Sequence, residues 1–298
     1  MRIHAASVRG ADPASTLERA RTLLDLEFAQ LSLEEPLHAL SWEVLRPALP
    51  RESVASLRLF LPYPRSVRVG TPSPWRLVHG DARDRAELVE QATRSFEVAD
   101  SCGIPRVLLP AAVVESSSGP SNDGTGRRSS SAPARAAVLD SYRSILDRLL
   151  GLADRYSVKV CVTPSPRPLE VPDVSEAADC LAEFAGASIS LWIDTLRIPD
   201  GLEVVADDPE APGLRGPDGR ALPLEGVSLR DCREEREGVM PGRGEVDWTA
   251  FDSLLRAAPL WLLDPGVEVA TASLPEGKVF LEELDGRGSD TAPEGLFF

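Results

Sequence analysis

Short apolar runs of strand length alternate with stretches of helical periodicity along most of the chain. The expected helices lie within 15–24, 42–49, 81–103, 134–150, 173–184 and 247–255, and the first, third, fifth and sixth of them begin at Ser or Asp caps. The expected strands are residues 1–8, 28–33, 54–61, 106–114, 157–163, 189–194, 226–231 and a last one within 260–270. This alternation is typical of an α/β protein with parallel strands.

Eight strand patterns with intervening helices predict a single-domain (β/α)8 TIM barrel over residues 1–298. A doubly wound open sheet is the competing architecture, but no GxGxxG sequence follows the first strand. The Ser/Gly-rich residues 115–134 predict a flexible insertion, either a lid or a tolerated loop. A truncated or irregular helix is expected after strand six, within 199–225, and residues 286–298 are expected to form a C-terminal tail.

Composition narrows the classes of function. The net charge of -15, from 47 acidic and 32 basic residues without a concentrated basic patch, disfavours nucleic acid as a partner. No apolar run approaches the ~20 residues that cross a bilayer, and the first residues lack the apolar core of a signal peptide. We therefore expect no membrane association and a cytoplasmic location. The four cysteines form no CxxC pair, which argues against a zinc finger. The sequence is compatible with a monomer or a homo-oligomer.

Three of the expected strands end on an aspartate, in the segments ISLWID, VSLRD and LWLLD. In a barrel these ends meet at one rim, so Asp194, Asp231 and Asp264 are candidate catalytic residues that would share a cavity. Crowded carboxylates either raise one another's pKa or bind a hard cation. Arg197 and Arg230 are candidates for binding substrate or neutralising these acids. The alternative is that the aspartates accept backbone N–H groups at the strand ends.

The segment VSLRDCREEREGVMPGRGEVDW resembles the strand-seven region of the xylose-isomerase-like barrel superfamily, which includes sugar and sugar-phosphate isomerases and epimerases. The matching loop residues are Pro241, Gly242, Gly244, Asp247 and Trp248. The resemblance implies the barrel fold and a divalent metal held at four strand ends by a Glu, an Asp, a His and a second Glu. Such a metal would stabilise an enediolate while a proton moves between carbons.

The ligand positions that the resemblance implies are mostly changed in this sequence. The first Glu is expected near Thr163, and the seventh-strand His is replaced by Ser228. Asp194 is kept, but the His that commonly follows three residues later is Arg197. We therefore expect an Arg197–Asp194 ion pair where the superfamily holds its metal.

The last Glu corresponds to Asp264 or Glu268, depending on the register of the final strand. Thr163, Ser228, Arg197 and Arg230 are candidate substrate-binding residues, together with Trp75, which lies in a proline-flanked loop and is a candidate for stacking on a sugar.

These observations predict an isomerase/epimerase-like barrel with a degenerate metal site, which binds a small sugar or polyol at the C-terminal rim of the strands and needs no cofactor. The alternative is an active isomerase or epimerase with a rebuilt, carboxylate-only site for Mg²⁺ or Mn²⁺. An abasic-site endonuclease of the same superfamily is disfavoured, because the chain has three histidines and a strongly negative charge.

Overall fold

The computed structural model describes residues 3–8, 13–34, 46–50, 53–59, 82–113, 132–168, 170–197, 203–205, 213–215, 219–234, 236–266 and 268–289. Trp75 lies outside these residues, as does most of the Ser/Gly-rich stretch predicted to be flexible.

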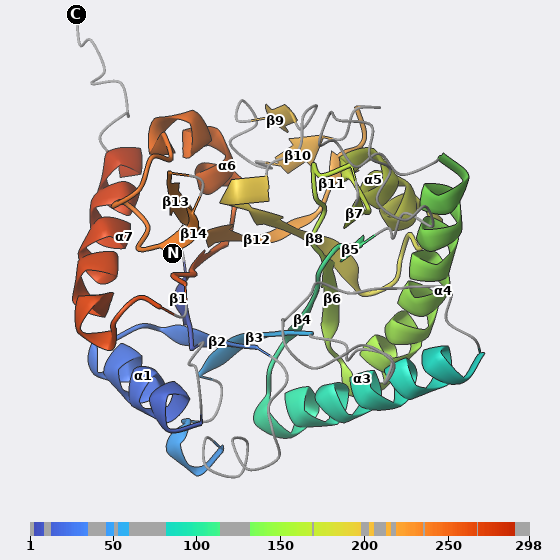
Figure 1. Ribbon diagram of the computed structural model, residues 1–298, viewed down its shortest axis with the longest axis horizontal. Coiled ribbons are helices and arrows are strands. Elements are labelled where there is room, and N and C mark those ends of the chain that lie inside the picture. The colour runs from blue at the N-terminus through green and yellow to red at the C-terminus, as the bar shows by residue number, and fades with distance from the viewer. Residues whose placement is uncertain are drawn as a thin grey trace, which may run out of the picture.

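Eight parallel strands close into a barrel in the order β1-β15-β12-β8-β6-β4-β3-β2. Figure 1 shows them as a ring with the helices around it. Closure is direct, because β1 pairs with both β2 and β15. The barrel prediction is therefore confirmed, and an open sheet is excluded. The strands are β1 Ile3–Ser7, β2 Gln30–Glu34, β3 Val54–Arg58, β4 Arg106–Leu109, β6 Lys159–Val162, β8 Ile189–Asp194, β12 Leu224–Leu229 and β15 Leu260–Leu263.

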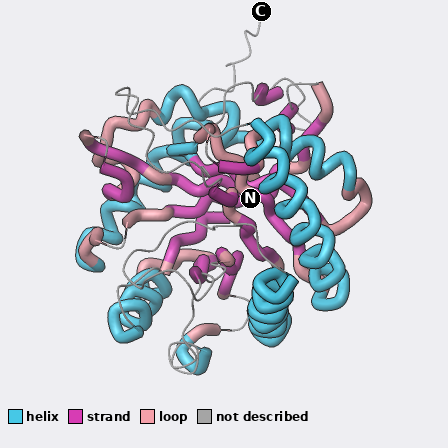
Figure 2. Tube along the Cα trace, turned by 45° about the vertical axis from the view of Figure 1, so that its right-hand side comes forward, coloured by secondary structure: helices cyan, strands magenta, loops and turns pink. Residues whose placement is uncertain are grey.

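The helices lie outside the strands (Figure 2), with their apolar faces against the barrel. In α4, for example, Tyr142, Leu146 and Leu149 recur at helical spacing and are fully buried. The capping box expected at Asp173 and Glu176 is present at the start of α5. The helices are α1 Pro13–Asp25, α3 Ala82–Cys102, α4 Ala132–Tyr156, α5 Val174–Glu183, α6 Asp252–Ala257 and α7 Leu274–Ser289, with 3-10 turns η1 Arg46–Ala48, η2 Thr195–Arg197, η3 Trp248–Phe251 and η4 Thr271–Ser273. No helix in the described part of the chain is long and apolar enough to span a membrane.

Short antiparallel strands extend the loops beyond the barrel. The described part of 199–225 holds a three-stranded sheet where a barrel helix would stand, so the irregularity expected there takes the form of strands. After β12 the chain forms a hairpin, β13–β14, before it reaches η3 and α6. The short strands are β5 Ala112–Val113, β7 Glu170–Val171, β9 Glu203–Val205, β10 Gly213–Arg215, β11 Ala221–Leu222, β13 Asp231–Arg233 and β14 Arg236–Val239.

Two boundaries expected from the sequence are wrong by a few residues. Residues 132–134, assigned to the insertion, begin α4, and residues 286–289, assigned to the C-terminal tail, end α7. A proline within the first turn of a helix costs no intrahelical hydrogen bond, so Pro133 does not prevent α4 from beginning at Ala132.

An ion triad lies at the N-terminal end of the barrel strands β4, β6 and β12. Glu225 of β12 accepts hydrogen bonds from Arg106 Nε at 2.7 Å and from Lys159 Nζ at 2.6 Å. Burial opposes ionisation of Glu225, but these two bonds lower the pKa of its carboxyl below its ordinary value. The triad therefore links three barrel strands at the end opposite the C-terminal rim.

Candidate functional site

The carboxyl ends of β8, β12 and β15 lie side by side at the C-terminal rim. Ser228 of β12 is the register partner of Asp194 in β8, and Asp264 donates its backbone N–H to Leu229 at 3.0 Å. Asp194 and Asp264 are both buried. The structure therefore brings together two of the three aspartates that the sequence predicted to share a cavity.

Arg230, directly after β12, lies between these two carboxylates. Its Nη1 donates to Asp194 Oδ2 at 2.9 Å, and its Nε lies 3.9 Å from Asp264 Oδ2. Thr195 Oγ1 fixes the backbone here, because it accepts from the Arg230 N–H and donates to the Arg230 carbonyl. Burial by itself would lower the pKa of Arg230, but the charges of the two carboxylates outweigh burial and raise this pKa above its ordinary value.

Arg58, the last residue of β3, reaches Asp264 and Ser228 from across the barrel. Its strand lies opposite β12, the strand of Ser228, because three strands separate β3 from β12 in either direction. Its Nη2 donates to Asp264 Oδ2 at 3.1 Å and to Ser228 Oγ at 3.3 Å. Ser228 Oγ also accepts from Trp192 Nε1 at 2.8 Å and is fully buried. Arg58 thus spans the barrel lumen just beneath the rim.

Three arginines and three carboxylates at the rim contact one another in turn and form a ring of alternating charge. Arg230 pairs with Asp194 and with Glu237 of β14, whose other oxygen contacts Arg167. Arg167 pairs with Glu170 at 3.3 Å, and Glu170 lies 3.7 Å from Arg197. Arg197 completes the ring, with its Nε 4.0 Å from Asp194. We call these six residues the arginine–carboxylate ring: Arg167, Glu170, Asp194, Arg197, Arg230 and Glu237.

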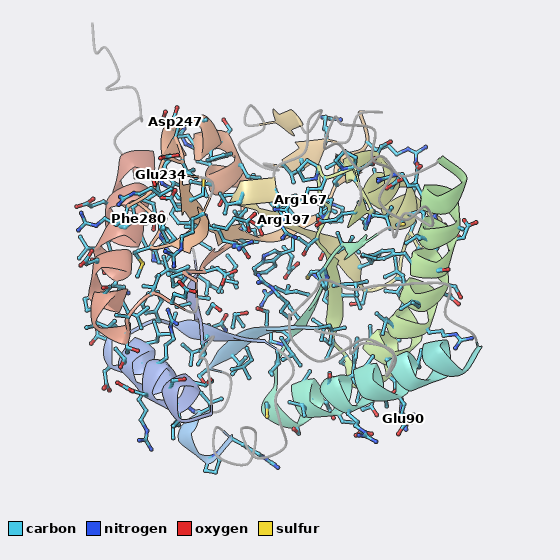
Figure 3. All side chains as sticks on the ribbon, viewed as in Figure 1. Glu90, Arg167, Arg197, Glu234, Asp247 and Phe280 are labelled. Carbon is cyan, nitrogen blue, oxygen red and sulfur yellow. The ribbon has the colours of Figure 1, made fainter. Side chains whose placement is uncertain are left out.

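The members of the ring come from β7, β8, η2, β14 and two loops, and Arg167 and Arg197, labelled in Figure 3, both contact Glu170. The Arg197–Asp194 ion pair expected from the sequence is formed, but it is longer than the pair that Asp194 makes with Arg230. Arg197 is also the least satisfied member. Its Nε is buried and makes no hydrogen bond within the described part of the chain.

Asp231 is turned away from the ring and into the loop that follows the hairpin. Its carboxylate accepts four backbone N–H groups, from Cys232, Gly242, Gly244 and Val246, at 2.8 to 3.1 Å. A Cβ at residue 244 would clash with the Asp231 side chain, which explains why this loop needs glycine there. The arrangement matches the alternative from the sequence, in which an aspartate at a strand end accepts backbone N–H groups.

The remaining candidates are Thr163, at the end of β6, and the two residues considered for the last acidic position, Asp264 and Glu268. Thr163 follows β6 and donates its backbone N–H to Leu109, which places it at the end of that strand. Asp264, and not Glu268, takes the inward position after β15. The Glu268 side chain is 72% exposed and pairs with Arg236 at the surface.

The donor atoms at the rim do not fit a divalent metal of the kind that the resemblance implies. Guanidinium groups engage Oδ2 of both Asp194 and Asp264, while Asp194 Oδ1 accepts the Leu196 N–H at 3.0 Å. Serine and threonine stand where imidazole and carboxylate ligands are expected. No group of three or more His, Cys, Asp or Glu side chains is arranged to hold a metal ion in the described ranges. Arginines therefore balance the charge of these acids.

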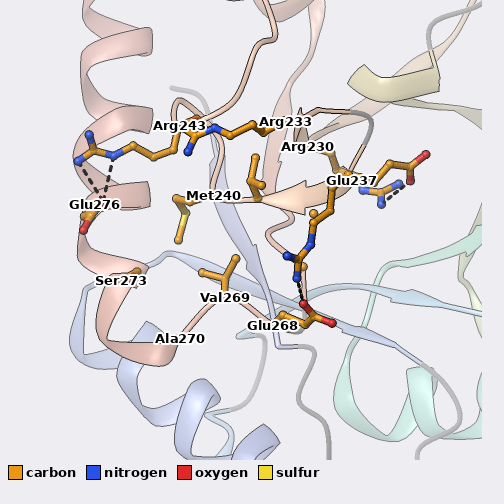
Figure 4. Close-up of a pocket in the computed structure, with 14 residues that line it drawn as sticks. Arg230, Arg233, Glu237, Met240, Arg243, Glu268, Val269, Ala270, Ser273 and Glu276 are labelled. Atoms are coloured by element: carbon orange, nitrogen blue, oxygen red, sulfur yellow. Dashed lines mark hydrogen bonds and ion pairs between the residues drawn. The ribbon is translucent and has the colours of Figure 1, made fainter.

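A cavity of about 770 Å³ opens beside the ring, between the β13–β14 hairpin, the loop after β15 and the start of α7. Figure 4 shows Arg230 and Glu237 on one side of this cavity and Arg243 and Glu276 on the other. Its volume is within the range of small-molecule sites. Because Arg230 and Glu237 belong to both, the cavity and the ring form one continuous candidate site.

Sequence reasoning missed Arg58, Arg167, Glu170 and Glu237. Arg58 gave a signal, because a charged residue at an alternate position of an otherwise apolar strand indicates a side chain that points into the barrel. The other three lie in loops or short strands whose positions no periodicity predicts.

Comparison with known proteins identifies the architecture. No protein-family model and no curated protein matches the sequence. Solved structures do match, over nearly the whole chain. A 3-keto-D-glucoside 4-epimerase from E. coli has a TM-score of 0.63 at 15% identity, with 95% of this chain and 100% of that chain covered. The IOLI protein with a bound zinc atom has a TM-score of 0.61 at 12% identity, with coverage of 97% and 98%.

A family 2 AP endonuclease from Brucella melitensis has a TM-score of 0.60 at 13% identity, with coverage of 95% and 99%. The chain has the xylose-isomerase-like barrel fold. The resemblance seen in the sequence is thus confirmed at the level of the fold. Since a sugar epimerase and an AP endonuclease share it, the function has to be argued from the site of this chain.

Proposed function

We propose that this protein is a metal-independent member of the barrel fold that binds a small sugar or polyol at the C-terminal rim of the strands. The observation that carries the proposal is the position of Arg230 between Asp194 and Asp264. A guanidinium there supplies the positive charge that the two acids need, but it has no Lewis-acid orbital with which to polarise a sugar carbonyl.

The same groups suit the recognition of hydroxyls. Carboxylate oxygens accept hydrogen bonds and guanidinium N–H groups donate them, so alternating charges offer both partners that a polyol needs. The ring is held from several elements and partly buried, so its members are oriented before a ligand arrives. Sugar substrates named for proteins of this fold, such as that of the 3-keto-D-glucoside 4-epimerase, support the same ligand class.

Metal content and ligand-induced stabilisation test this proposal. We expect purified protein to contain no stoichiometric divalent metal, and its Tm to be unchanged by Mg²⁺ or Mn²⁺. A hexose or hexitol that binds should raise Tm, because a ligand at 100 times its Kd adds about 2.7 kcal/mol to the free energy of unfolding. The increase should be lost in Asp194→Asn and kept in Glu282→Gln, which removes one charge from the exposed surface of α7, outside both the ring and the cavity.

The contrary result is equally specific. A stoichiometric cation, together with isomerase or epimerase activity that Asp194→Asn abolishes, would establish the carboxylate-only metal enzyme instead. Protein that neither holds metal nor responds to any sugar or polyol would refute the proposed ligand class.

A further inference from the structure

The arginine–carboxylate ring contains one carboxylate that differs from the others. The Glu170 and Asp194 side chains are 6% and 7% exposed, whereas that of Glu237 is 35% exposed. Glu237 also comes from β14 of the surface hairpin, while Asp194 ends a barrel strand. One of its oxygens contacts Arg167 and the other lies 3.2 Å from Arg230. Glu237 therefore bridges two guanidiniums from the solvent side of the ring.

Arg197 provides a second, independent observation at the same place. Its only charged contacts within the described residues are 3.7 Å to Glu170 and 4.0 Å to Asp194, both beyond hydrogen-bond distance. Its Nε is buried without a hydrogen-bond partner in that part of the chain. Buried polar groups are normally satisfied, so this donor indicates that an acceptor is missing when the ring is closed.

We infer that the ring is an oxyanion site, and that Glu237 occupies the position of the carboxylate or phosphate group of an acidic sugar or polyol. This inference rests on the function proposed above and narrows its ligand class. A bound oxyanion would replace Glu237 between Arg167 and Arg230 and supply an acceptor for Arg197. The rest of the ligand would lie in the cavity that Arg230 and Glu237 line.

Charge and geometry favour this exchange. A carboxylate replaces Glu237 charge for charge, and guanidiniums bind carboxylate and phosphate oxygens in a bidentate way. The partly exposed Glu237 pairs are weak enough to be displaced, because solvent screens them. Gly238, next to Glu237, has a positive φ of 88° and can change conformation without the penalty a larger residue would meet. Glu237 would thus compete with the ligand until it is displaced.

The test is equilibrium binding to the full chain and to Glu237→Gln, with Glu282→Gln as the control. Glu282 is 61% exposed and pairs with Lys278 on α7, outside the ring and the cavity, so both variants lose one negative charge but only Glu237→Gln loses it from the site. The probes are D-glucose, D-gluconate, D-glucose 6-phosphate and inorganic phosphate. We expect Glu237→Gln to lower the Kd for gluconate or glucose 6-phosphate roughly tenfold, on the scale of two partly exposed ion pairs, and to change the Kd for glucose much less. Which of the two acids responds identifies carboxylate or phosphate.

A second variant tests the same site by loss. Arg197→Gln should weaken binding of the responding acid about tenfold or more and weaken glucose binding much less, because only the acid carries the oxyanion. Equal tightening in Glu237→Gln and Glu282→Gln would reveal a general charge effect and overturn the inference. Glucose binding with no gain for either acid in Glu237→Gln would overturn the oxyanion site but leave the proposed function standing. Tighter inorganic phosphate in Glu237→Gln, with no sugar bound, would keep the oxyanion site and refute the sugar ligand. No binding of any probe would refute both.

Discussion

Replacing Arg230 with methionine tests whether arginine carries the charge balance of the rim. Methionine keeps an unbranched, apolar stem of similar length and removes only the guanidinium. The Arg230 side chain is 15% exposed, and its partners Asp194 and Asp264 are 7% and 4% exposed. The substitution therefore leaves two buried carboxylates without the cation that lies between them.

The expected cost follows from these contacts. Removing one partner of a buried ion pair costs about 3–5 kcal/mol, because the other charge stays buried. Here the loss is smaller, since Asp264 keeps Arg58 at 3.1 Å and Asp194 keeps Arg197 at 4.0 Å. We expect Arg230→Met to lower the free energy of unfolding by roughly 2–3 kcal/mol.

Urea unfolding at neutral pH measures this difference, with Arg236→Met as the control. Arg236 pairs with Glu268, and both side chains are more than 70% exposed, so the control should change stability by less than about 0.5 kcal/mol. Adding Asp194→Asn to Arg230→Met should cost less than it does in the wild type, with a coupling of at least about 1 kcal/mol. If Arg230→Met is no more destabilising than Arg236→Met, Arg230 does not neutralise the rim.

Two further substitutions separate structural carboxylates from those of the ring. Glu225→Gln, at the N-terminal end of the barrel, should cost roughly 1–2 kcal/mol at pH 7, since it removes the carboxylate that pairs with Arg106 and Lys159. Because the pKa of Glu225 is lowered in the folded state, its contribution is complete above the unfolded pKa and is lost as pH falls through the folded pKa. The stabilities of mutant and wild type from urea unfolding should therefore converge at acid pH, below the ordinary pKa of a glutamate. Asp231→Asn should cost about 2–4 kcal/mol and expose residues 241–247 to protease, because it changes the carboxylate that accepts the loop N–H groups. Asp247→Asn should be nearly neutral, because asparagine and aspartate cap helices about equally well. Loss of ligand binding in Asp231→Asn without loss of stability would instead make Asp231 a site residue.

The barrel itself was predictable from the sequence because it depends on periodicity. Apolar runs of strand length between amphipathic helices specify parallel strands covered on both faces, and eight of them close a ring. The convergence of Asp194, Asp264 and Arg230 followed from the same rule, since residues at the carboxyl ends of adjacent strands must lie at one rim. The positions of these three residues thus needed no knowledge of the loops.

Side-chain direction beyond a strand end was not predictable in this way. Asp231 is only three residues after Ser228, but it begins a new strand, β13, and its carboxylate turns into the loop that holds the glycines. Whether an aspartate after a strand faces the lumen or its own loop depends on the turn that follows. Glu237 and Glu170 reach the ring through short strands outside the barrel, and their meeting depends on contacts between loops far apart in sequence.

The ring links charge, stability and chemistry in a single arrangement. Three carboxylates at a barrel rim repel one another, and the fold resolves this either with a divalent cation or with fixed positive side chains. Arginine is charged at every physiological pH and offers several donors in one plane, so three of them can order three acids without any exchangeable ion. A carboxylate oxygen that accepts from a guanidinium is less available to take a proton from a sugar carbon. Under the function proposed here, the contacts that order this rim therefore serve ligand binding and not proton transfer.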